Sequence, residues 1–370
     1  MAIVDRFSKV IIFYQLLALH WFNLRRKWVG WLEVALYVTL NFSLITALLY
    51  WIYHNEEKVI FTGNWLGYVV DLSKYLLMVF THYSLFLESG LHGSILRNVW
   101  RELDQIVRLI PRAKWARQQR AHLVTVGSFL AYISWWELTF AYYVCKTDRG
   151  TTFTVTFWIL FTLLHLRQLQ ILLYTNLLGF CLATLNAELG WTIELSKGAR
   201  RYGGRRSDGQ ICGHLHTLMD AFARTERLLD LLNHAFGYSF TIIKLINHFY
   251  ILTDTYWIVN GFIGGEVFNS LYLECCLSSK LICLMLNLHS NERILIECRR
   301  IQELLHRVDL GWQLRCDRGW HMVQNFLLRL RYSQPFAVTA LSMFRMDYSV
   351  MMEIAFNVTA SISLFIQASG

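Results

Sequence analysis

Residues 348–367 read YSVMMEIAFNVTASISLFIQ, and this stretch decides the fold class. Between Tyr348 and Ile366 it carries a single charged residue, Glu353. An apolar run of about 19 residues is long enough to cross the hydrocarbon core of a bilayer as a helix. The stretch therefore predicts a membrane-spanning helix.

Polar and small residues of this helix fall on one side when it is drawn at about 100° per residue. They are Glu353, Asn357, Ala360, Ser361, Leu364 and Gln367. Polar side chains at bilayer depth are costly unless they face water or another helix. The stripe is thus either the lining of a pore or a contact face, because small residues and amides also hold membrane helices together.

The composition of the whole chain agrees with a membrane protein. Hydrophobic residues make up 55% of the sequence and charged residues 16%, and this balance is unusual for a soluble domain. The eight cysteines show no paired spacing for zinc, and we expect neither a metal nor a cofactor. No nucleophile and base stand together, so we expect no enzyme. We read the net charge of +9 by position and do not take it as a signal for nucleic acid.

Seven segments have the length and apolarity of membrane spans. They are Leu32 to Tyr53, Leu66 to Leu91, Leu123 to Val144, Phe153 to Leu178, Phe240 to Phe262, Phe268 to Leu288, and Tyr348 to Ile366. Helical periodicity continues past several of these segments, which predicts helices that extend beyond the membrane.

Lysine and arginine set the orientation. The segments before span one, between two and three, between four and five, and between six and seven carry 5, 7, 7 and 9 of the 35 basic residues. The opposite face carries only Lys58, Lys146 and Arg149. The positive-inside tendency therefore predicts a cytoplasmic N-terminus and, with seven spans, an extracellular C-terminus.

This layout predicts four parts. Residues 1–31 form an N-terminal helix at the cytoplasmic interface, and 32–288 form a six-helix membrane bundle with a cytoplasmic helical extension at 181–237. Residues 289–346 form cytoplasmic helices, and 347–370 form the seventh helix.

Aromatic and acidic residues cluster in the predicted outer halves of the spans. Aromatic walls with a few polar groups are typical of small-molecule sites. The candidate ligand residues are Asp71, Trp135, Trp136, Glu137, Trp158, Asp254, Trp257 and Tyr272. Tryptophan and tyrosine also gather at membrane interfaces whatever the protein does, so this alternative stays open for the aromatic members.

Several charged residues have a structural alternative. Asp71 and Lys74, spaced i and i+3, can neutralise each other, and Glu353 can form an interhelical salt bridge with a basic residue such as Arg345 near the inner boundary. A second set is expected to form a buried network that holds the bundle: His165, Arg167, Gln168, Gln170, Lys244 and His248.

Motifs from Phe326 onward resemble those of the insect gustatory receptors, within the insect chemoreceptor superfamily. The family's Phe-x-x-Gln-Leu aligns with Phe326 to Leu330, its Phe-to-Asp run with Phe336 to Asp347, and its closing Thr-Tyr, hydrophobic run and Gln-Phe with Ala360 to Ala368. Arg329, Ala360-Ser361 and Ala368 replace characteristic residues of these motifs, which makes the chain a divergent member.

The resemblance implies a ligand-gated, non-selective cation channel that assembles as a homo- or hetero-tetramer with other gustatory receptor subunits. It implies a multi-pass protein of the plasma membrane of sensory neurons, surrounded by lipid. It further implies that an extracellular small-molecule tastant opens the channel, and the divergence of the closing motif favours a bitter or other non-sugar compound. The seventh helix, 347–370, would then line the pore, with Glu353 toward its cytoplasmic half and Gln367 at its outer mouth. The cytoplasmic helices of 289–346 would form a shared anchor, and the bundle of 32–288 would hold the ligand pocket.

Two other classes are weighed against this interpretation. A membrane transporter or a non-conducting scaffold is less favoured because the chain shows no internal repeat or interrupted span. A seven-span receptor that signals through G proteins would need the opposite orientation, and the chain contains no Asn-Pro pair.

Overall fold

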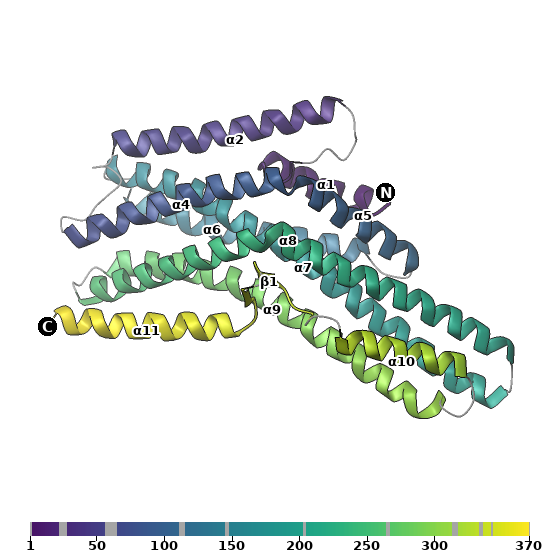
Figure 1. Ribbon diagram of the computed structural model, residues 1–370. Coiled ribbons are helices and arrows are strands. Elements are labelled where there is room, and N and C mark those ends of the chain that lie inside the picture. The colour runs from purple at the N-terminus through teal and green to yellow at the C-terminus, as the bar shows by residue number, and fades with distance from the viewer. Residues whose placement is uncertain are drawn as a thin grey trace.

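The computed structural model is almost entirely helical (Figure 1). It describes residues 2–21, 28–55, 65–110, 115–144, 148–202, 205–263, 267–312, 317–332, 336–341 and 343–369. The elements in chain order are α1 (Ala2–Leu16), α2 (Trp28–His54), α4 (Trp65–Leu91), α5 (Gly93–Leu109), α6 (Trp115–Val144), α7 (Asp148–Tyr202), α8 (Arg205–Ile263), α9 (Val267–Trp312), α10 (Asp317–Tyr332), β1 (Thr339–Ala340), β2 (Phe344–Arg345) and α11 (Ser349–Ser369). The predicted all-α class is confirmed for the described residues, apart from the two short strands.

Six of the predicted spans lie inside one helix each, and the seventh coincides with α11 except for Tyr348, which comes just before that helix. Three of these helices continue well beyond the predicted span. Helices α7, α8 and α9 have 55, 59 and 46 residues. At 1.5 Å per residue, each is longer than the roughly 30 Å of a bilayer core. The predicted extension of these helices beyond membrane length is therefore confirmed.

Two described stretches are long and apolar enough to cross a membrane by composition alone, Trp31–His54 in α2 and Ile159–Leu195 in α7. In α2 only 11% of the most apolar window is buried, whereas in α7 the figure is 78%. Helix α2 thus presents its apolar side chains outward, as lipid contact requires, and α7 is the central helix of the bundle. The count of seven spans remains a prediction.

The helices form an elongated bundle around α7, α8 and α9 (Figure 1). Helix α7 packs on α6, α8 and α9, and α8 also packs on α4 and α5. Helix α10 lies on α8 and α9 near one end of the molecule, and α11 runs beside α8 toward the opposite end, with α2 on the far side of the bundle. The two ends are therefore built differently.

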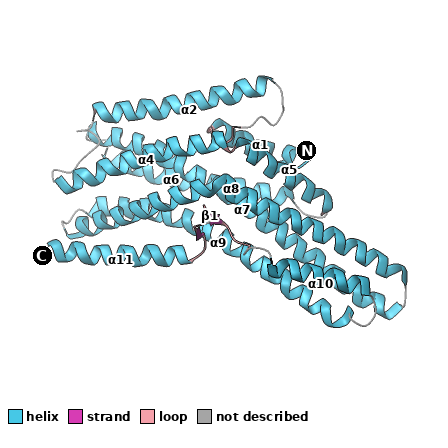
Figure 2. Cartoon of the chain, in the orientation of Figure 1, coloured by secondary structure: helices cyan, strands magenta, loops and turns pink. Residues whose placement is uncertain are grey.

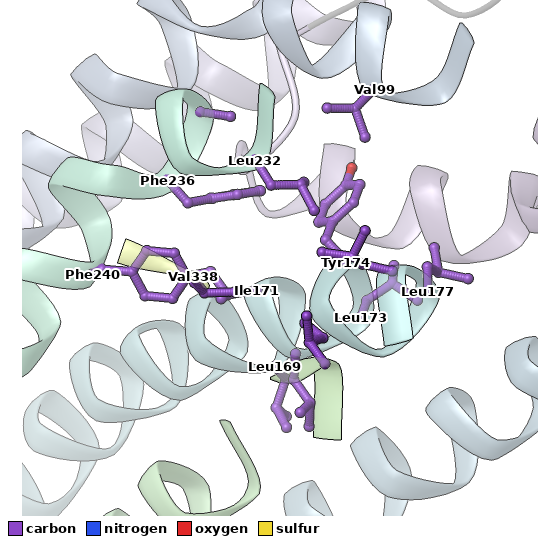
Figure 3. Packing of buried hydrophobic residues seen from close by; sticks show 14 of the residues in the cluster. Val99, Leu169, Ile171, Leu173, Tyr174, Leu177, Leu232, Phe236, Phe240 and Val338 are labelled. Carbon is purple, nitrogen blue, oxygen red and sulfur yellow. The ribbon is translucent and has the colours of Figure 1, made fainter. Parts of the chain in front are cut away.

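The apolar core is continuous along the shared part of the bundle. Figure 3 shows Tyr174 and Leu177 of α7 beside Leu232 and Phe236 of α8, with Val99 of α5 close by. All five side chains are buried. Burying one large apolar side chain contributes about 1.5–3 kcal/mol relative to leaving it in water, which makes these contacts the main link between α5, α7 and α8.

A buried ion pair joins three helices inside this core. Arg167 Nη2 of α7 lies 2.8 Å from Glu88 Oε2 of α4, and both side chains are almost inaccessible. The Glu88 carboxylate also accepts the Ser239 backbone N–H of α8 at 2.9 Å, and the Arg167 guanidinium donates to Gln170 Oε1 at 2.6 Å. The predicted network is confirmed for Arg167 and Gln170, and its charges cancel.

The loop after α1 is fastened to the same network. The Leu19 carbonyl accepts hydrogen bonds from Gln170 Nε2 at 3.1 Å and Arg167 Nη1 at 3.4 Å. His20 Nε2 lies 3.0 Å from the hydroxyl of Tyr174. A Cβ added at Gly90 of α4 would lie 2.8 Å from the ring of Trp21, so any side chain at position 90 would clash with this loop.

A short hairpin connects α10 to α11 (magenta in Figure 2). Strands β1 and β2 pair antiparallel, with Thr339 opposite Arg345. Asn233 of α8 holds the hairpin by donating to the Ala337 carbonyl at 3.2 Å and accepting the Thr339 N–H at 3.0 Å. This attachment fixes where α11 begins. It also means that the segment 289–346, predicted as anchor helices, ends in a hairpin.

Removing one partner of the Glu88–Arg167 pair is expected to destabilise the fold strongly, because it leaves the other charge buried without a counter-ion. We expect Arg167→Met to cost about 3–5 kcal/mol, and the charge-free double variant Glu88→Gln/Arg167→Met to cost less than that. Thermal unfolding in detergent measures both. Arg120→Met is the control, because Arg120 is exposed on α6 and its replacement should change stability by less than about 1 kcal/mol. Additive losses in the double variant would contradict the assignment.

Low pH is expected to weaken the attachment of the N-terminal segment to the bundle and so to lower the stability of the fold. Burial lowers the pKa of His20 to about 3, with a further contribution from Arg167, and burial lowers the pKa of His122 to about 4. The unfolded chain therefore binds more protons than the folded chain below about pH 6.5, and stability falls as the pH drops from there. At pH 5 the loss is about 2 kcal/mol for each histidine.

Unfolding temperatures at pH 7.5 and pH 5 test this expectation. His122→Gln should lose less stability on acidification than the natural chain. The exposed His216, changed to Gln, is the control and should leave the pH dependence as it was. An unchanged pH dependence in His122→Gln would show that this histidine does not titrate on unfolding.

Candidate functional site

Three buried charges from three helices meet in the bundle. Lys74 Nζ of α4 lies 2.8 Å from Asp254 Oδ1 of α8, and Lys280 Nζ of α9 bonds to Oδ2 of the same carboxylate. The three side chains are 10%, 3% and 2% exposed. Each charged group inside a membrane bundle needs a partner, and here one carboxylate serves two ammonium groups.

Aromatic rings surround the two ammonium groups. Lys280 Nζ lies 4.5 Å from the ring centroid of Tyr250 and 5.0 Å from that of Phe161, and Lys74 Nζ lies 5.8 Å from the Tyr250 ring. The Tyr250 hydroxyl donates to the Lys74 carbonyl at 2.9 Å. The negative faces of the rings stabilise positive charge where water is excluded. We call Lys74, Asp254 and Lys280 with Tyr250 and Phe161 the charged cluster.

A histidine borders this cluster. His165 is fully buried, its ring centroid lies 4.0 Å from that of Phe161, and its Nδ1 donates to the Phe161 carbonyl at 2.8 Å. Its Nε2 has no hydrogen-bond partner among the described residues. Buried polar atoms usually have a hydrogen-bond partner, and the Nε2 atom of His165 is an exception beside a charged group.

The structure separates the predicted ligand residues. Asp254 belongs to the charged cluster, and Trp257 lies one helical turn further along α8, half-buried. Trp136 is half-buried and packs its ring 6.5 Å from that of Tyr132, whereas Trp135 is 69% exposed on the outside of α6, where the interface alternative fits better. The side chains of four others lie outside the description: Asp71, Glu137, Trp158 and Tyr272.

The sequence patterns did not identify the two lysines of the charged cluster as site residues. Lys74 was considered only as a possible partner of Asp71, whose side chain lies outside the description, and the structure shows its ion pair with Asp254. Lys280 carried no expectation beyond its place in a span. Lysine at bilayer depth is rare enough to be a signal by itself. Pairing each intramembrane lysine with the intramembrane acids on other helices would have pointed to Asp254.

Helix α11 contacts the bundle through one apolar edge. Val350 and Ile354 are 2% exposed and belong to the core, while Met352 and Phe356 on the other side are 74% exposed. Among the predicted pore residues, Glu353 and Ala360 are exposed, Asn357 and Ser361 are half-buried, and the side chains of Leu364 and Gln367 lie outside the description. The polar stripe therefore flanks the contact edge and does not form it.

Glu353 is paired, but not with Arg345. Lys244 Nζ of α8 lies 2.7 Å from Glu353 Oε2, and the Glu353 side chain remains 52% exposed. The alternative of an interhelical salt bridge between Glu353 and a basic residue is therefore confirmed, and the partner is Lys244. An exposed carboxylate on a bridge of this kind can still act on ions beside it.

The fold as a whole is that of an insect chemosensory receptor. The chain is similar to the insect olfactory receptor OR5 from Machilis hrabei in complex with eugenol, with 12% identity, a TM-score of 0.62, and coverage of 99% of this chain and 98% of that one. A second structure of OR5 from Machilis hrabei gives 13% identity, a TM-score of 0.61 and the same coverage. At these identities the likeness establishes the fold.

The family follows from the sequence. The model of the 7tm chemosensory receptor family matches residues 10–369, and the chain belongs to that family. Membership implies a membrane protein of sensory neurons. No curated protein matches the sequence significantly.

The Lys244–Glu353 bridge is expected to contribute little to stability because Glu353 is half-exposed. We expect Glu353→Gln and Lys244→Met each to change the free energy of unfolding by less than about 1 kcal/mol, with a coupling energy of the same order in the double variant. Thermal unfolding of the four proteins of this cycle measures it. A coupling of several kcal/mol would mean that the bridge holds α11 in place.

Proposed function

We propose that this protein is a gustatory receptor, a subunit of a ligand-gated, non-selective cation channel opened by an extracellular small-molecule tastant, bitter or otherwise non-sugar. Membership of the chemosensory receptor family supports the receptor role. The observation that carries the channel role is the placement of α11. This helix has membrane-spanning length, joins its own chain along one apolar edge, and leaves its polar stripe beside that edge.

An apolar helix with polar residues uncovered in its own chain calls for other subunits. Four copies of α11 around an axis would place Glu353, Asn357, Ala360, Ser361, Leu364 and Gln367 along a shared pore. A ring of carboxylates from Glu353 favours cations because it replaces lost hydration and repels anions. The assembly is a tetramer, either of this chain alone or with other gustatory receptor subunits.

The proposed topology has seven spans, α2, α4, α6, α7, α8, α9 and α11, with the N-terminus in the cytoplasm and the C-terminus outside. Residues 32–288 supply the bundle and its ligand site, and 289–346 with α10 supply the cytoplasmic anchor. In this orientation the end of the molecule that carries α10 lies in the cytoplasm, where the basic residues concentrate. The plasma membrane of the sensory neuron is the site of action.

The ligand site is assigned to the outer part of the bundle. Lys74 lies roughly nine residues, about 14 Å of helix, below the start of α4, and Asp254 lies about the same distance below the end of α8. Both helix ends face outward in the proposed topology. The candidate ligand residues in and around the charged cluster, Asp254, Trp257 and Trp136 among them, are reached from that side.

Recording currents tests the proposal. Cells that express the chain alone or with other gustatory receptor subunits are expected to show a ligand-evoked cation current under a panel of bitter and sugar compounds. An epitope at the C-terminus, accessible on intact cells, verifies delivery and topology together. An inaccessible C-terminal tag on cells with surface protein would contradict the topology, and no evoked current in any pairing would count against the channel.

Ion selectivity separates a pore role of Glu353 from a packing role. Glu353→Gln is expected to lower the permeability of cations relative to anions, seen as a shifted reversal potential in a salt gradient. Lys244→Met is the matched variant, because it breaks the same bridge and keeps the carboxylate. If both variants shift selectivity equally, Glu353 acts through the bridge. If neither does, the stripe is a packing face.

A further inference from the structure

The two buried ionic groups of the bundle differ in their charge balance. Around Arg167 one guanidinium meets one carboxylate, that of Glu88, and neutral groups satisfy the remaining bonds. Around Asp254 one carboxylate meets two ammonium groups, those of Lys74 and Lys280. Among the described side chains, the first group is neutral and the second carries one excess positive charge.

Excess positive charge in a buried site is expensive. Lys74 and Lys280 are both paired with Asp254, but one carboxylate balances only one of the two positive charges, and both ammonium groups lose their hydration. Tyr250 and Phe161 provide ring faces at 4.5–5.8 Å from the ammonium nitrogens, and these faces stabilise positive charge where water is excluded. An anion between the two ammonium groups would balance the charge fully.

The surroundings favour an organic anion. The cluster is walled by rings and borders His165, whose buried Nε2 has no partner among the described residues. With Nδ1 donating to the Phe161 carbonyl, the neutral imidazole presents a lone pair at Nε2, which can accept a hydrogen bond from a ligand hydroxyl or amide. Positive charge, aromatic faces and one acceptor together match a small carboxylic acid with an apolar body.

We propose that the charged cluster recognises the carboxylate of the tastant, so that small aromatic or aliphatic organic acids are the ligand class of this receptor. The carboxylate binds the ammonium groups of Lys74 and Lys280, and the apolar body of the acid packs on Tyr250 and Phe161. Asp254 bridges the two lysines and limits the affinity for the ligand, because its carboxylate competes for the same donors. This inference rests on the ligand site of the proposed function and names what that site takes.

Binding is tested first without the channel. Benzoate is expected to raise the unfolding temperature of the purified full-length protein in a concentration-dependent way, and benzamide, which has nearly the same shape and no charge, is expected to do so far more weakly. Chloride in place of methanesulfonate at equal ionic strength is the control for a site that takes any anion. Equal effects of chloride and benzoate, or of benzamide and benzoate, would overturn the proposal.

Variants with opposite expected signs then separate recognition from structure. Lys280→Met and Lys74→Met each remove one donor and should weaken benzoate binding by about tenfold or more. Asp254→Asn removes the competing carboxylate and should strengthen benzoate binding several-fold, with benzoate restoring the stability that the variant loses. If the cluster is purely structural, all three variants lose stability and benzoate restores none of it.

Currents distinguish the failure of this inference from the failure of the proposed function. Benzoate-evoked currents that are lost in Lys280→Met support both. Benzoate binding to the purified protein without any evoked current supports the acid site and contradicts the channel. Currents evoked by neutral compounds, with no binding of benzoate, support the channel and overturn the acid site.

Discussion

Burial of charge without water is the constraint on which this structure depends. Helix α7 carries Arg167 into the centre of the bundle, and the arginine is tolerated because Glu88 of α4, Ser239 of α8 and Gln170 meet it there. The same group also holds the loop after α1 through the Leu19 carbonyl. Because these bonds have fixed lengths and directions, they set the positions of the helices more narrowly than apolar packing does.

The two ends of the molecule differ in how their helices are packed. Long continuations of α7, α8 and α9, covered by α10, make one end a packed helical body, whereas α11 at the other end touches mainly α8. Between them lie the hairpin and its attachment at Asn233. A terminal helix that is fixed at its start and loosely held along its length can shift against α8, and such a shift is what opening a pore would require.

The charged cluster and the Lys244–Glu353 bridge both have one partner on α8. Asp254 lies roughly ten residues, about 15 Å, beyond Lys244 on the same helix. A ligand that changes the pairing of Asp254 would act on the helix that carries α11. This gives the proposed receptor a direct physical link between its ligand site and its last helix.

The sequence alone determined the helical class, the positions of the apolar helices and the extension of the long ones, because apolar periodicity and run length depend only on neighbouring residues. It also indicated Asp254 and Glu353, since acids at bilayer depth stand out. Only the tertiary structure decided their partners, which are Lys74 and Lys280 for Asp254 and Lys244 for Glu353. Ion pairs between helices depend on how the helices rotate and pack against one another, and a pattern read along one chain segment does not contain that information.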